Sequence, residues 1–322
     1  MARWQNQFKY DPINALLASG NNQIIYFTNR DLLDKPSDPI EILWDLKIPK
    51  QILHEQQADG SWKYPGKTAW HTTDYSQLET YRQLGFLIRM FGLKKSHTAI
   101  ENAAEYFFTK QSDKGDFRGI YAAQYSPNYT AAIAELLILA GYGNDHRIQK
   151  VFDWLLVARQ DDGGWALPLR TKGHNLEAIL HQETIEPDKS KPFSHFVTGI
   201  VLRPFAAQPK NAQSQEAKVA GKLLASRFFQ KDIYTDLKSP NAWQTFSYPF
   251  WNTDLLSSLH ILSKLGFNKD HLQIRKAIDW LLDHQGEDGL LDVHRNHDRY
   301  HDQNLWLTLA FCRAIKDFHR KT

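Results

Sequence analysis

A short segment of Gln, Asp, Gly and an aromatic residue recurs along this chain. The clearest copies are residues 56–62 (QQADGSW) and 160–165 (QDDGGW). Residues 111–117 have Phe in place of Trp, and residues 285–291 have lost the aromatic residue. Self-similarity at this spacing predicts stacked helical repeats, in which each unit buries the face of its neighbour.

Each copy follows an amphipathic run and precedes a more apolar one, so the chain should alternate outer and inner helices. The Gly supplies a stop with positive φ. We expect the Gln to bind free backbone groups at the helix end and the aromatic ring to stack on it. The predicted outer helices are 42–56, 96–111, 145–160, 212–230 and 269–285, and the inner helices are 74–91, 128–141, 195–207, 251–265 and 302–318.

These turns, their spacing and the aromatic content of 13% resemble the squalene–hopene cyclase and protein prenyltransferase superfamily from about residue 42 onward. The resemblance implies an all-α fold, an α/α toroid of five to six helix pairs in a single domain over residues 1–322. It also implies a central cavity that holds isoprenoid chains. Residues 1–41 are expected to help close the ring, and residues 166–193 form a long inserted loop, either a lid or a surface insert.

Composition narrows the partners and the location of the protein. The net charge of +3 and the absence of a Lys/Arg run argue against nucleic acid. Cys312 is the only cysteine, which rules out an intrachain disulfide and fits a cytoplasmic protein. We expect no secretion signal and no membrane span, while a peripheral membrane contact stays open. The sequence does not indicate whether the protein is a monomer or an oligomer.

In a ring of helix pairs, the N-termini of the inner helices meet at one mouth. Free N–H groups and helix dipoles there favour an anion such as a diphosphate. We therefore expect the apolar part of a substrate in the cavity and its polar head at this mouth. The residues expected to bind substrate are His71, Tyr75, Tyr129, Phe196, Arg203, Trp251, Tyr300, Asp302 and Trp306. The alternative for the Ser, Thr and Asp residues at these entries, including Thr73, Thr253 and Asp302, is helix capping.

Four residues are the predicted catalytic groups that handle protons: Asp74, Asp254, His195 and His301. Squalene–hopene cyclases protonate an alkene with an Asp-x-Asp-Asp motif, which this chain lacks. Any acid must therefore be another desolvated carboxyl. Glu79 and Glu135 are the next candidates, although Glu79 could simply pair with Arg82.

A metal site is incomplete in the sequence. Residues 298–301 (DRYH) resemble a segment of the protein farnesyltransferase β subunit in which the His binds zinc. Thr245 and Ser247 stand at the positions of that family's other two ligands, and neither is a usual zinc ligand. We assign no metal residues. Mg²⁺ or Zn²⁺ at a different set, such as His71, Asp254 and His301, stays an alternative.

The leading hypothesis is a protein that binds or converts an isoprenoid, related to terpene cyclases and prenyltransferases. Two alternatives remain: a lipid-binding or scaffold toroid without catalysis, and a carbohydrate-active α/α toroid enzyme, which would need paired carboxylates beside aromatic platforms.

Overall fold

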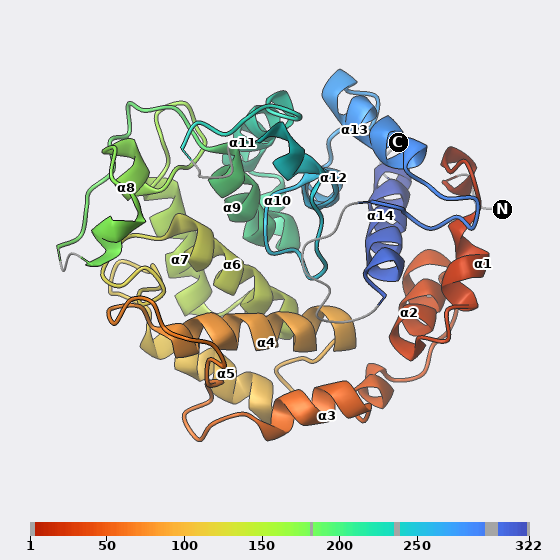
Figure 1. Cartoon of the computed structure of the whole chain (residues 1–322), viewed down its shortest axis with the longest axis horizontal. Helices are drawn as coiled ribbons and strands as arrows, with labels where there is room; N and C mark the ends of the chain where they lie inside the picture. The colour runs from red at the N-terminus through yellow and green to blue at the C-terminus, as the bar shows by residue number, and fades with distance from the viewer. Residues whose placement is uncertain (1–3, 181–182, 235–238, 294–301, 321–322) are drawn as a thin grey trace. The chain divides into compact units, whose positions relative to one another are not determined.

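The computed structural model describes residues 4–180, 183–234, 239–293 and 302–320 (Figure 1), and regular structure in these residues is helical apart from isolated β-bridges. All the predicted outer and inner helices are present. The outer helices are α3 (Lys47–His54), α5 (Thr98–Thr109), α7 (His146–Val157), α11 (Gln215–Ser226) and α13 (Leu272–Asp283). The inner helices are α4 (Tyr75–Phe91), α6 (Pro127–Leu137), α9 (His195–Ala207), α12 (Leu255–Lys264) and α14 (Gln303–Arg320). Shorter helices are α1 (Pro12–Leu17), α2 (Asn22–Phe27), α8 (Pro168–Thr171) and α10 (Pro209–Ala212).

The helices group into two compact units. One unit comprises Ile40–Gln208, and the other comprises the chain up to Pro39 together with the chain from Pro209 onward. Within the first unit α6 packs against α9, and within the second α12 packs against α14. No helix among the described residues has the length and apolar character needed to cross a bilayer.

Inner and outer helices differ in how much of their surface is buried. In α6 every residue except Tyr129 is buried. In α7 burial is confined to a stripe of Ile148, Val151, Phe152, Trp154 and Leu155. This spacing of three to four residues marks a helix that packs on one side only. The sequence pattern therefore distinguishes the two kinds of helix.

In two of the turns a tryptophan closes the joint between helices by hydrogen bonding. The indole Nε1 of Trp62 donates to Ile52 O at 2.6 Å, and that of Trp165 donates to Leu155 O at 2.7 Å. The backbone N–H of each tryptophan donates to a threonine of the next inner helix, Thr80 in α4 and Thr198 in α9. These two turns are thus bonded both to the outer helix before them and to the inner helix after them.

The glutamine of the turn reaches farther than the sequence suggested. Gln56 Nε2 donates to Gly60 O within its own turn and to Ala99 O in the next outer helix, at 3.0 and 2.8 Å. Gln111 makes the equivalent pair of bonds to Gly115 O and Arg147 O. The expected partners were at the end of the preceding helix. The actual partners include the start of the following outer helix, so the glutamine joins successive repeats.

In the turn after α7, Arg159 replaces this glutamine. Arg159 Nε and Nη2 donate to Gly163 O, the carbonyl that matches Gly60 O. Gln160, which the sequence suggested for this role, bonds Asp188 O and Lys191 O in the long loop. The turn is one residue shorter from Gln to Trp than the first copy, so an alignment on Gln misplaces it.

The last turn contacts the N-terminal segment in the same way. Gln285 Nε2 donates to Gly289 O and to Tyr10 O, just before α1, and Tyr10 N donates back to Gln285 Oε1. Lys316 of α14 adds bonds to Asp31 O and Leu32 O. Within this unit, the N-terminal segment therefore takes the place of a next outer helix after α13.

Candidate functional site

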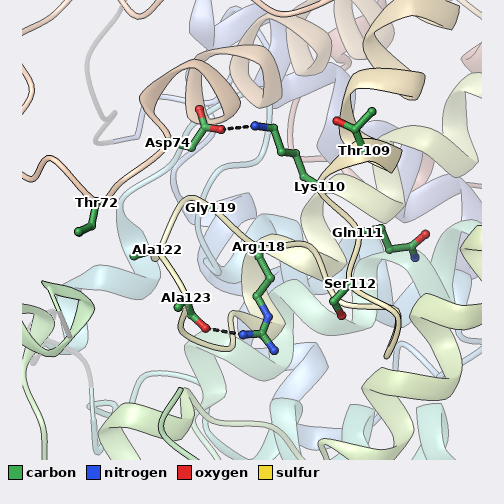
Figure 2. A pocket seen from close by; sticks show the side chains of 10 residues that line it. All are labelled: Thr72, Asp74, Thr109, Lys110, Gln111, Ser112, Arg118, Gly119, Ala122 and Ala123. Atoms are coloured by element: carbon green, nitrogen blue, oxygen red, sulfur yellow. Dashed lines mark hydrogen bonds and ion pairs between the residues drawn. The ribbon is translucent and has the colours of Figure 1, made fainter. Parts of the chain in front are cut away.

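A pocket of about 570 Å³ lies where α5 ends and α4 begins (Figure 2). We call it the polar pocket. Its lining residues are Thr72, Asp74, Thr109, Lys110, Gln111, Ser112, Arg118, Gly119, Ala122 and Ala123. All of them belong to the unit Ile40–Gln208. Its size lies within the range typical of small-molecule sites.

Helix ends position the charged groups of the polar pocket. Asp74 is the N-cap of α4 and accepts a hydrogen bond from Gln77 N at 2.9 Å. Lys110 is the C-cap of α5, and its Nζ lies 2.8 Å from Asp74 Oδ2 (Figure 2). Gly119 O accepts from Asp74 N, which holds the loop against the start of α4. Three chain segments therefore meet at the Asp74 carboxylate.

Tyr106 of α5 also contacts this carboxylate. Its hydroxyl lies 3.4 Å from both oxygens of Asp74. Burial and the neighbouring Asp74 charge raise the pKa of the Tyr106 hydroxyl, so it stays protonated and can act as a donor. Asp74 thus has an ammonium, a hydroxyl and a backbone N–H among its partners.

Arg118 supplies the second cation of the polar pocket. It pairs with Asp116 and donates to Ala123 O, the second contact drawn in Figure 2. Its guanidinium lies 4.3 Å from the centroid of the Tyr125 ring, within the range of a cation–π contact. The lining therefore carries two cations and one carboxylate, and the Asp116 carboxylate that balances Arg118 is fully buried behind it.

A second group of polar side chains lies in the interior, between α4, α6 and α9. Arg89 pairs with Glu135, and the two side chains are only 8% and 10% exposed. Arg203, 2% exposed, hydrogen-bonds Tyr81. Burial raises the pKa of the Tyr81 hydroxyl, while the Arg203 charge opposes that shift. Such buried charges are expected only where each is paired or bonded.

The predicted catalytic residues do not all belong to one compact unit. Asp74 lies in the polar pocket. His195 is the first residue of α9 and is buried in the same unit. Asp254 belongs to the other unit, is 1% exposed, and caps α12 by accepting from Ser257 N at 2.7 Å. His301 lies outside the described residues, as does Tyr300.

The N-caps of α4 and α12 are Asp74 and Asp254. The sequence analysis suggested Thr73 and Thr253 as these caps, which is wrong, because each true cap is the next residue along the chain.

The residues predicted to bind substrate have varied surroundings. His71 and Asp302 are exposed, while Phe196 and Trp251 are half-buried. Trp306 is 1% exposed and stacks on Tyr248 at a centroid distance of 5.1 Å. In the unit with the polar pocket, Tyr75 packs on Tyr64, and Tyr129 contacts both Tyr81 and Tyr121 edge-on. Arg203 is buried in α9.

Glu79 and Glu135, the next candidates for a catalytic acid, each form an ion pair with an arginine. Glu79 lies 3.5 Å from Arg82, the structural pairing that the sequence offered as an alternative, and it also accepts from Gln83 Nε2 at 2.6 Å. Glu135 pairs with Arg89. Both carboxylates are buried beside cations, which favours a structural role.

Metal ligands do not converge in the described part of the chain. No group of three or more His, Cys, Asp and Glu side chains there could hold a metal ion. The alternative set of His71, Asp254 and His301 includes one residue outside that part. Mg²⁺ or Zn²⁺ binding at such a set therefore stays a prediction.

Sequence reasoning missed Lys110, Arg118, Tyr106 and Tyr81. Lys110 and Tyr106 lie on an outer helix, whereas the search followed the starts of inner helices. One signal was available: Lys110 directly precedes the glutamine of a turn, and a turn places the end of an outer helix beside the start of an inner one.

Comparison with known proteins shows the fold. No family model matches the sequence, and no curated protein sequence matches it significantly. Among solved structures, a type II terpene cyclase from Scytonema matches with a TM-score of 0.51 and 14% identity, over 99% of both chains. A polysaccharide lyase matches with a TM-score of 0.50 and 14% identity, over 98% of this chain and 90% of that one. These likenesses confirm the predicted α/α toroid fold and extend to both terpenoid and carbohydrate enzymes.

Proposed function

We propose that this protein binds and converts an isoprenoid whose anionic head group lies in the polar pocket. The observation that carries the proposal is the pair of cations, Lys110 and Arg118, at the N-terminus of α4. Free N–H groups of that helix and the two cations favour a diphosphate or carboxylate. The fold likeness to a type II terpene cyclase and the superfamily resemblance of the turns support an isoprenoid as the rest of the ligand.

In this proposal an incoming anion competes with Asp74 for Lys110. The partner set of Asp74, an ammonium and a backbone N–H, suits charge pairing better than donation of a proton to an alkene. Proton transfer is therefore assigned to His195, which is buried in the same unit as the polar pocket, with Asp74 holding Lys110 in place. The roles of Asp254 and His301 stay predictions from the sequence. The prenyl chain would lie along the inner helices of the unit Ile40–Gln208, beside Tyr129.

The test measures thermal stabilisation by geranylgeranyl diphosphate, by inorganic diphosphate and by acidic oligosaccharides. A ligand at about a hundred times its Kd should stabilise the fold by about 2.7 kcal/mol. Both diphosphates should raise the melting temperature, the prenylated one more. Lys110→Ala and Arg118→Ala should each weaken this binding about tenfold or more. The matched control is Lys50→Ala, which removes an exposed lysine of α3 that pairs with Asp45.

Each outcome decides between the hypotheses. Stabilisation only by oligosaccharides would replace the proposal with a carbohydrate-active enzyme. Stabilisation by geranylgeranyl diphosphate without turnover would indicate the lipid-binding alternative. If His195→Ala leaves turnover unchanged, the assignment of proton transfer to His195 is wrong.

A further inference from the structure

A second pocket lies at the end of α7, one repeat after the polar pocket. We call it the apolar pocket. It has a volume of about 430 Å³, and its apolar lining is Tyr125, Trp154, Val157, Ala158, Pro168 and Pro187. The long loop after α7 contributes both prolines. We propose that the apolar pocket is a binding site for a small, neutral, predominantly apolar molecule, separate from the polar pocket.

The charged side chains around the apolar pocket already have partners. Lys114 Nζ bonds the Tyr125 hydroxyl, which in turn donates to Glu186 at 3.0 Å. Lys189 Nζ donates to Val157 O, and Asp153 accepts from Gln149 Nε2. These two lysines and two carboxylates sum to zero charge. A charged ligand would find no net attraction from this lining, which favours a neutral ligand.

The exposed surface beside the pocket indicates its apolar character. Val157 is 68% exposed and Leu156 is 39% exposed. In the repeat before, Thr109 stands at the position of Val157, and Phe108, which is 9% exposed, stands at the position of Leu156. Apolar side chains gathered at an open pocket are typical of ligand sites, because a ligand that covers them removes apolar surface from water.

The long loop gives this pocket a built wall. Gln160 holds the loop through Asp188 O and Lys191 O, and Thr171 Oγ1 accepts from Asp188 N at 2.9 Å. Trp154 and Tyr125 also line the pocket, with ring centroids 5.9 Å apart. The pocket is therefore formed by bonded segments, as expected of a site that is ready before its ligand arrives.

The test uses the whole protein labelled with 5-fluorotryptophan and the neutral probe 2-naphthol. The ¹⁹F signal of Trp154, assigned by its loss in Trp154→Phe, should shift saturably on titration. Ala158→Phe fills the pocket and should weaken this binding at least tenfold. Residue 158 has φ −79° and ψ 0°, a conformation open to other L-residues. Val157→Ser should weaken binding about threefold, because it removes apolar contact.

The matched control for Val157→Ser is Leu272→Ser, since Leu272 of α13 is 65% exposed and lies outside the pocket. Urea unfolding midpoints report whether each variant folds, and Val157→Ser tests the pocket even if Ala158→Phe does not fold. An unmoved Trp154 signal, or equal binding by wild type and both pocket variants, would overturn the proposal. Lys110→Ala, which weakens diphosphate binding at the polar pocket, should leave the shift of the Trp154 signal by 2-naphthol in place, so the two proposals fail independently.

Discussion

The polar pocket at the end of α5 and the apolar pocket at the end of α7 occupy matching places in consecutive repeats. The last two residues before the bonding side chain of the turn are Thr109 and Lys110 in one, and Val157 and Ala158 in the other. An aromatic residue lies five positions before that side chain in both, Tyr106 and Trp154. The backbone frame is repeated, and the side chains beside it set the chemistry.

The connection that follows each turn adds to the difference. After the turn at residues 111–117, a short loop passes Gly119 and Ala123 beside Asp74. After the turn at residues 160–165, the long loop adds Pro168 and Pro187 to the pocket that Trp154 lines. Repeat proteins tolerate such insertions at their surface, because loop length adds little to the cost of closing a loop. A new pocket can therefore form without any change in the helices.

The largest expected difference is the loss of stability when a glycine is replaced in the turn beside the polar pocket or in the loop beside the apolar pocket. Gly115 has φ 108°, and a Cβ there would collide with the backbone of Lys150. Gly173 in the long loop has φ 78° with open space around it. Gly115→Ala should therefore lower the free energy of unfolding by about 2–4 kcal/mol, against about 1 kcal/mol for Gly173→Ala. Urea denaturation measures both, and equal losses would show that the turn is not a close contact between repeats.

The bonding side chains of the two turns, Gln111 and Arg159, differ in whether they reach the next outer helix. Gln111 bonds its own turn and Arg147 O of the next outer helix, whereas the hydrogen bonds of Arg159 within the described part of the chain go to Gly163 O alone. Gln111→Ala should cost about 1–2 kcal/mol of unfolding free energy, and Arg159→Ala about 0.5–1 kcal/mol. Thermal or urea unfolding of the two variants provides the check. A larger loss for Arg159→Ala would reverse this ranking of the joints.

The smallest effect is a difference in pH response between the helices that end at the two pockets. His97 is the N-cap of α5: its Nδ1 accepts from Ala99 N, and burial lowers the pKa of His97 below its ordinary value of 6.5. Asp145 is the N-cap of α7, and hydrogen bonds from Arg147 lower the pKa of its carboxyl below 3.8 despite partial burial. The depressed pKa of His97 means that its contribution is present above the unfolded value and is lost as pH falls through the folded value.

As the pH falls from about 7.5 to about 5, the contribution of the His97 cap to the free energy of unfolding should therefore decrease by about 1 kcal/mol, while that of the Asp145 cap stays the same. The measurement is the free energy of unfolding at both pH values for wild type and His97→Asn, because asparagine caps a helix at either pH. His97→Asn should remove this part of the pH dependence. Asp145→Asn is the control and should leave it in place. A parallel pH response of wild type and His97→Asn would show that the His97 cap does not titrate in this range.

The helices and the α/α toroid fold could be predicted from the sequence. The spacing of apolar residues along α7 and the Asp-Gly turns are local signals, because a helix face and a positive-φ glycine depend on neighbouring residues only. It also indicated Asp74 as a residue of interest, since the start of an inner helix can be read from the same pattern.

The residues that share a pocket could not be predicted from the sequence and are known from the packing of the helices. Lys110 lies 2.8 Å from Asp74 across 36 positions of the sequence, and Arg159 takes over the bond of a glutamine that sequence alignment placed at Gln160. Long side chains from an outer helix, a turn and a loop can meet in many ways that have the same local pattern. Their partners are set by the packing of one repeat on the next, which no single segment of sequence specifies.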